Sequence, residues 1–157
     1  MRLTASRLLF GAALAVLLLA VAMRWQRVGE RALLASPTLT PGVTSRGVTQ
    51  ANIGRTICVR GWTRTVRPPT SYTSALKSEQ LRAYGLRGPP SAYQEDHLIS
   101  LELGGDPTDP RNLWPEPYPR AADVDRIENE LNARVCSGRM TLTVAQREEA
   151  ALKHEHG

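Results

Sequence analysis

The sequence predicts an α+β fold, built as one small domain over residues 48–157 with a short strand at its N-terminal end. Three observations support this prediction. The chain has 157 residues, which suffices for one hydrophobic core but not for two. Runs of β-branched or alternating residues predict short strands, whereas apolar residues at helical spacing predict helices. The composition, with 41% apolar residues and two cysteines, excludes a collagen, a disulfide-dense miniprotein and a wholly disordered acidic chain.

The first half of this domain predicts a strand and a helix. Thr56–Val59 is a β-branched run that ends at Gly61, which is typical of a short strand. Ser74–Tyr84 carries Leu76, Gln80 and Leu81 at near-helical spacing, so we expect a helix there that stops before Gly85.

The second half predicts two further strands and two helices. His97–Leu103 alternates between two faces, and the short segment Asn112–Trp114 can return beside it before the following prolines interrupt pairing. Ala121–Val135 is the clearest helix, because its apolar residues follow one stripe. Those residues are Val124, Ile127, Leu131 and Val135. A last helix is expected from Thr143, where Thr143 and Gln146 match a capping box.

The N-terminus is typical of an export signal or a membrane anchor. Arg2 and Arg7 precede an uncharged, mostly apolar run over residues 8–23. As a helix this run would span about 24 Å, short of a hydrocarbon core of about 30 Å. A secretory signal over residues 1–22, cleaved after Ala22, is one interpretation, and an uncleaved membrane tether through residues 8–23 is the other. Either one places the domain outside the cytoplasm, whether periplasmic, extracellular or membrane-anchored.

A flexible linker is expected over residues 23–47, before the folded domain. Its second half, Ser36–Gly47, reads SPTLTPGVTSRG, which offers little to bury.

The two cysteines, Cys58 and Cys136, suit an oxidising compartment, where an even pair usually forms a disulfide. Such a bridge would join the N-terminal part of the domain to its C-terminal part. Two buried free thiols are the alternative.

The net charge of +5 is unevenly distributed. Residues 1–94 carry 13 basic and 2 acidic side chains, whereas residues 95–157 carry 7 basic and 13 acidic. This asymmetry suggests that the first part binds a polyanion while the second part uses carboxylates for another purpose. Ordinary solvated surface charge is the alternative.

The centre of the chain carries the residues that suggest a chemistry. Asp96-His97, Gly104-Gly105 and Asn112-Leu113 occur in this order, followed by the predicted helix with its polar stripe. In this order and spacing the segment resembles the HNH, or His-Me finger, endonucleases. The resemblance covers about 40 residues, from Glu95 to Arg134, and implies a ββα-metal core over about 95–135 with flanking helices.

The resemblance implies roles for the motif residues. His97 would be the general base that activates water, and Asp96 would bind one divalent ion, Mg²⁺ in the first place, with Mn²⁺ or another divalent ion as alternatives. Asn112 would bridge the two strands and orient His97. The family's later His or Asn falls on Ala121 here, so a substitute metal ligand is expected among oxygens of the predicted helix. The candidates are Asp125, Glu128 and Asn129, which taken singly would be a solvated helix face.

The implied function is hydrolysis of phosphodiester bonds in nucleic acid with low sequence specificity, DNA being favoured over RNA. Arginines would supply sequence-independent phosphate contacts. The candidates are Arg60, Arg64, Arg67, Arg111 and Arg126. No small-molecule cofactor is expected. Two alternatives stay open: a catalytically inactive ββα module that binds nucleic acid, and an envelope interaction protein that binds anionic polymers.

Overall fold

The computed structural model describes residues 15–16, 18–20, 23 and 34–155. The chain divides into two units, residues 1–32 and 33–157, and the second contains the fold described below. The signal or anchor expected at residues 1–22 lies largely outside the described residues. No helix in the described part is long and apolar enough to cross a membrane.

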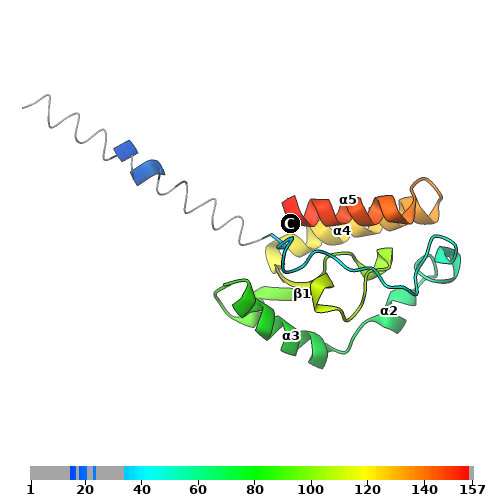
Figure 1. Ribbon diagram of the computed structural model, residues 1–157, viewed down its shortest axis with the longest axis horizontal. Coiled ribbons are helices and arrows are strands. Elements are labelled where there is room, and N and C mark those ends of the chain that lie inside the picture. The colour runs from blue at the N-terminus through cyan, green and yellow to red at the C-terminus, as the bar shows by residue number, and fades with distance from the viewer. Residues whose placement is uncertain (1–14, 17, 21–22, 24–33, 156–157) are drawn as a thin grey trace, which may run out of the picture. The chain divides into compact units, whose positions relative to one another are not determined.

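The fold is α+β, as predicted, with one antiparallel sheet of two strands, β1 (Tyr93–His97) and β2 (Leu113–Pro117). Figure 1 shows α3 on one side of β1, and α4 with α5 on the other. The α-helices of this unit are α2 (Trp62–Val66), α3 (Thr70–Ala83), α4 (Tyr118–Cys136) and α5 (Leu142–Glu155). Single 3-10 turns precede α2, at Ile53–Arg55, and connect the later elements, at Pro90–Ala92, Leu101–Leu103 and Pro110–Asn112.

The first strand of the sheet ends at His97, so the predicted strand His97–Leu103 is wrong. Its Leu101–Leu103 part forms a 3-10 turn instead. The alternation of residues was misleading because the consecutive residues Leu98 and Ile99 are both buried. The alternation therefore did not separate a core face from a solvent face. The backbone N–H and C=O of Ile99 bond to the side chain of Asn112 rather than to another strand.

The second strand continues through the prolines that were expected to interrupt it. Pro115 lies opposite Glu95, and Pro117 lies opposite Tyr93. In a two-stranded antiparallel sheet, alternate N–H groups point away from the partner strand, and proline at those positions removes no bond between the strands.

The predicted N-terminal strand Thr56–Val59 is also wrong, because these residues form turns. Their amides bond locally, as when Cys58 N–H donates to the carbonyl of Ile53. Ile57 is nevertheless buried in the core, so the β-branched run marked burial rather than a strand. Cys58 forms the predicted disulfide with Cys136 at the end of α4.

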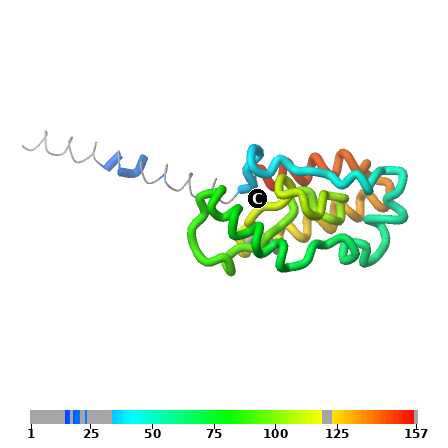
Figure 2. Tube along the Cα trace, turned by 60° about the horizontal axis from the view of Figure 1, so that its bottom comes forward, coloured from blue at the N-terminus to red at the C-terminus, as the bar shows by residue number. Residues whose placement is uncertain are grey.

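Of the flexible linker expected over residues 23–47, residues 24–33 lie outside the described residues, and residues 36–47 are bonded to the folded unit instead. Thr40 Oγ1 donates to the Leu113 carbonyl of β2 at 3.1 Å, and Thr44 forms a β-bridge with Gly105. In Figure 2 this segment (cyan) runs along the length of the unit. The folded unit therefore begins well before residue 48, because backbone groups of this polar segment pair with the loops around the sheet.

The three long helices follow the predicted ones with shifted ends. α3 begins four residues before the predicted Ser74, and α4 extends the predicted helix at both ends. In α4 the predicted apolar stripe faces the core. α5 begins at Leu142, so Thr143 lies inside the helix rather than at its N-cap, and Gln146 Nε2 donates to the Leu103 carbonyl.

Candidate functional site

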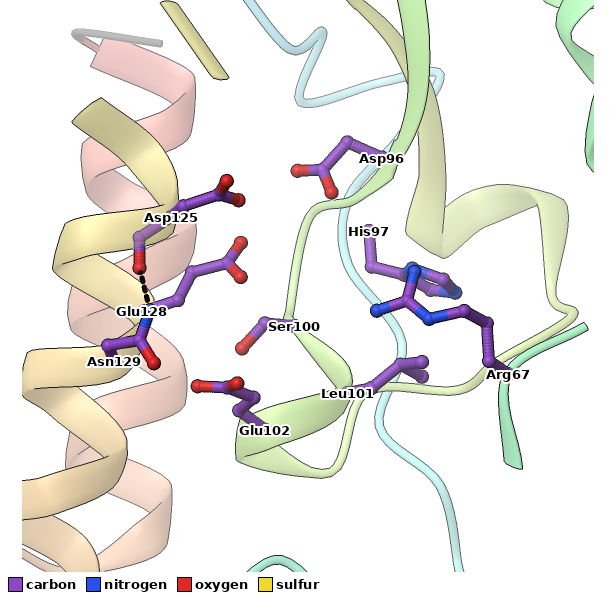
Figure 3. Close-up of a pocket in the computed structure, with 9 residues that line it drawn as sticks. All are labelled: Arg67, Asp96, His97, Ser100, Leu101, Glu102, Asp125, Glu128 and Asn129. Atoms are coloured by element: carbon purple, nitrogen blue, oxygen red, sulfur yellow. Dashed lines mark hydrogen bonds between the residues drawn. The ribbon is translucent and has the colours of Figure 1, made fainter. Parts of the chain in front are cut away.

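A polar cavity of about 260 Å³ lies where the end of β1, the turn after it and α4 meet (Figure 3). Most of its lining consists of charged or hydrogen-bonding side chains. The lining residues are Arg67, Asp96, His97, Ser100, Leu101, Glu102, Asp125, Glu128 and Asn129. Six of the predicted site residues thus line one cavity: Arg67, Asp96, His97, Asp125, Glu128 and Asn129.

Asp96 and His97 reach this cavity from opposite faces of the sheet. Successive residues of a strand point to opposite sides, and Figure 3 shows the two side chains leaving β1 in opposite directions. Both line the cavity because β1 ends at His97 and the chain turns there. Asp96 therefore lies on the side of α4, whereas His97 lies on the side of Arg67.

His97 is held in one tautomer by the loop between the strands. Its side chain is buried, with 4% exposed, and Nε2 lies 3.1 Å from the carbonyl oxygen of Pro107. A carbonyl only accepts hydrogen bonds, so Nε2 carries the proton and Nδ1 keeps its lone pair. Burial lowers the pKa of His97 below its usual value of about 6.5, although the charge of Asp96 opposes this shift. A neutral imidazole with a free Nδ1 can accept a proton at pH 7.

Asn112 organises the loop that contains Pro107. It is fully buried, and its Oδ1 accepts from the amides of Val43 at 3.2 Å and Ile99 at 3.0 Å. Its Nδ2 donates to the carbonyls of Ile99 at 3.0 Å and Asp106 at 2.9 Å. Asn112 does not line the cavity, and its bonds close the loop rather than bridge the paired residues of the two strands. Asp106 directly precedes Pro107, so Asn112 bonds to the same loop whose Pro107 carbonyl lies next to His97 Nε2.

The polar stripe of α4 forms the opposite wall of the cavity. Asp125, Glu128 and Asn129 come from consecutive turns of this helix and line the same space. Asn129 Nδ2 donates to the backbone carbonyl of Asp125 at 2.6 Å, so its Oδ1 is the remaining amide acceptor. Burial raises the pKa of Glu128, whereas the ammonium of nearby Lys153 lowers it and favours the charged carboxylate.

Lys153, on α5, is a member of the site that sequence reasoning missed. Its side chain is 3% exposed, and Nζ lies 3.0 Å from Asp96 Oδ2 and 2.6 Å from Glu128 Oε1. The ammonium also donates to the backbone carbonyl of His97 at 2.5 Å. A third carboxylate, that of Glu149 one turn earlier on α5, lies 3.5 Å away.

A signal for Lys153 was present in the sequence. The buried residues of α5 follow one stripe at spacings of three, four and four positions, and the charged residues Glu149 and Lys153 continue the stripe that begins with Leu142 and Ala145. Charged side chains in a buried stripe require partners. Glu149 has one in the turn after β1, because both its oxygens accept from the backbone amide of Ser100, at 3.1 and 3.0 Å.

The donor set of the cavity is of the type that holds a hard divalent cation. Asp96 and Glu128 each use one oxygen for Lys153, which leaves the second oxygen of each carboxylate outside these bonds. The amide of Asn129 and the carboxylate of Asp125 add further oxygens. Oxygen ligands of this kind suit Mg²⁺. Among the described residues, however, no three His, Cys, Asp or Glu side chains form a ready-made metal site.

Of the five predicted phosphate-binding arginines, Arg67 is the one that lines the cavity. His97 lines the same cavity, and the two side chains overlap in the view of Figure 3. Arg111 is paired with Asp109 at 2.6 Å and Arg126 with Asp123 at 3.5 Å, both on exposed surface. The remaining two, Arg60 and Arg64, are exposed in or just before α2.

Comparisons with protein-family models, with curated proteins and with solved structures gave no significant match.

Proposed function

We propose that this protein is a metal-dependent endonuclease that hydrolyses phosphodiester bonds of nucleic acid with low sequence specificity. In this proposal β1, β2 and α4 form a ββα core of the His-Me finger type, which the sequence resembles. The observation that carries the proposal is the buried His97, whose Nε2 lies 3.1 Å from the Pro107 carbonyl oxygen, in one cavity with carboxylates and an arginine.

His97 would act as the general base. Nδ1 would take a proton from a water molecule as the water oxygen attacks phosphorus, and the imidazole would become positively charged. The Pro107 carbonyl would stabilise that charge, because its bond to Nε2–H strengthens when the ring is cationic. Burial lowers the pKa of His97, which keeps the base form available at neutral pH.

Arg67 would hold the phosphate that is attacked. Its side chain lines the same cavity as His97, and a guanidinium can donate two hydrogen bonds to one phosphate group. The exposed arginines that precede it, Arg60 and Arg64, would contact the neighbouring phosphates, where affinity depends on salt rather than on base sequence.

Four side chains would hold the divalent ion: Asp96, Asp125, Glu128 and Asn129. When bound, the ion would supply positive charge to the phosphate and to the departing oxygen. The protein contributes oxygens from β1 on one side and from α4 on the other. β2 pairs with β1 and leads directly into α4.

The test is cleavage of supercoiled plasmid DNA, and of a structured RNA, by the full-length protein with Mg²⁺, with Mn²⁺ or with chelator. His97→Gln removes the base while keeping a side-chain donor for the Pro107 carbonyl. We expect it to lower the rate by about 100-fold or more. The matched control is His154→Gln, because His154 lies outside the cavity and bonds to the Thr40 carbonyl; it should cleave at the wild-type rate.

Full activity of His97→Gln would contradict the proposed role of this residue. If the protein binds nucleic acid in a salt-sensitive way but cleaves it under no condition, the protein is a nucleic-acid-binding module and the proposed enzymatic activity is wrong. If the protein neither binds nor cleaves nucleic acid, binding of anionic envelope polymers is the remaining hypothesis.

A further inference from the structure

The ammonium of Lys153 occupies a position between the sheet and both C-terminal helices. It bonds to Asp96 of β1 and Glu128 of α4, and Glu149 lies one turn before it on α5. Lys153 does not itself line the cavity, although Asp96 and Glu128 do. The residue therefore acts on the cavity through Asp96 and Glu128.

The bonding pattern has two consequences for these two carboxylates. First, each is held by a buried partner, so its orientation does not depend on a bound metal ion. Second, the bonded oxygen, Oδ2 of Asp96 or Oε1 of Glu128, lies within 3.0 Å of a positive charge. A divalent cation that binds these carboxylates must therefore approach an ammonium ion, and repulsion between like charges is strong at a site shielded from water.

We propose that Lys153 is a built-in counter-cation of this cavity, which positions Asp96 and Glu128 in the metal-free protein and thereby weakens their binding of a divalent ion. This inference rests on the metal site of the proposed function, but it concerns ion affinity rather than cleavage. Lys153 is a positioning residue in this scheme and touches neither substrate nor ion.

Replacement of Lys153 alone would leave buried carboxylates without their cation, and such a variant can fail to fold. The sharper variant is Lys153→Met combined with Glu149→Gln. It removes one positive and one negative charge together, and the glutamine oxygen can still accept from the Ser100 amide that Glu149 binds. Asp96 and Glu128 stay in place and lose the ammonium that competes with a divalent ion.

The experiment measures Mn²⁺ affinity of the full-length protein by calorimetry and by the electron paramagnetic resonance of free Mn²⁺. The double variant should bind Mn²⁺ about tenfold or more tightly than the wild type, a change well outside measurement error. Lys153→Arg keeps the charge and should stay within roughly threefold of the wild type. Asp96→Asn should abolish the tight binding, which assigns the ion to this cavity.

Equal or weaker Mn²⁺ binding by the folded double variant would overturn the inference, as would the absence of Mn²⁺ binding from every variant. If circular dichroism shows that the double variant does not fold, the Mn²⁺ affinity of the single variant Glu149→Gln tests the inference. This change leaves the ammonium more strongly held by Asp96 and Glu128, so Mn²⁺ should bind at least about threefold more weakly, and unchanged affinity would refute the inference. Absence of nuclease activity in the wild type would refute the proposed function. The order of Mn²⁺ affinities among the variants would still test the role of Lys153.

Discussion

Replacement of Asn112 by alanine should destabilise the folded unit severely. The amide of this fully buried side chain makes four hydrogen bonds to backbone groups from three separate segments. Two of those bonds involve the N–H and C=O of Ile99, which the structure buries. Alanine would leave all four backbone groups without this partner.

The magnitude follows from the number of groups left unpaired. A buried donor or acceptor that loses its partner costs about 1–3 kcal/mol. The two Ile99 groups, together with the partly buried Val43 and Asp106 groups, give a loss of about 4 kcal/mol in the free energy of unfolding. Domains of this size are stable by about 5–15 kcal/mol, so the variant should lose a large share of its stability. Asn112→Asp should be no better, because a carboxylate cannot donate to the Ile99 and Asp106 carbonyls.

The measurement is urea unfolding in the absence of divalent ions, followed by tryptophan fluorescence, since Trp114 is 1% exposed and should report the loss of the core. Asn129→Ala is the matched control, because Asn129 is exposed and its side chain bonds to the carbonyl one turn earlier on the same helix. Its cost should be within about 0.5 kcal/mol. A loss of less than about 1 kcal/mol for Asn112→Ala would show that the backbone groups find other partners and that the loop does not depend on this side chain.

Three further predictions concern the disulfide, a buried carboxyl group and the proposed base. Replacing Cys58 and Cys136 by serine opens a bridge across 78 positions and should lower the free energy of unfolding by about 4 kcal/mol in urea titrations; a loss under about 1 kcal/mol would contradict the chain-entropy estimate. Burial raises the pKa of Glu95 to about 8, so its carboxyl group takes up a proton on folding. The stability that this proton uptake contributes is full at acidic pH and is lost as the pH rises towards 8. Glu95→Gln should therefore be more stable than the wild type at pH 8 and lose this advantage towards pH 5, whereas parallel stability curves would refute the burial argument. Because burial lowers the pKa of His97, the cleavage rate should rise with pH and level off below about pH 6.5, and a midpoint well above that value in the rate profile would exclude His97 as the base.

The grouping of the site residues could be predicted from local rules. Asp96 and His97 stand at the end of a strand, and the stripe of α4 repeats with the period of a helix, so both sets of side chains follow from regular geometry. Asn112 could be predicted as a structural residue from the resemblance, although its bonds run to the loop backbone rather than across paired strand residues. The disulfide followed from an even cysteine count in a chain with an export-like N-terminus.

The irregular parts could not be predicted, because their conformation depends on distant partners. Residues 98–103 alternate in hydrophobicity as a strand would, yet the side chains of Asn112 and Glu149 bind their backbone groups and turn the chain. Residues 36–47 have the composition of a linker, yet the loops around the sheet accept their hydrogen bonds. In both cases the deciding bonds join residues far apart in the sequence, which neither composition nor periodicity records.

Lys153 shows most clearly how a local pattern can be correct and still leave the chemistry open. Its place in the stripe of α5 predicts burial, and a buried ammonium requires anionic partners. Glu149, one turn away, is the partner that helical spacing suggests, but the shorter contacts are with Asp96 and Glu128. Those contacts exist because α5 packs along α4 and reaches the end of β1. The charge that should govern ion binding at the cavity thus comes from an element that the motif does not include, and a search for the motif alone would leave it out.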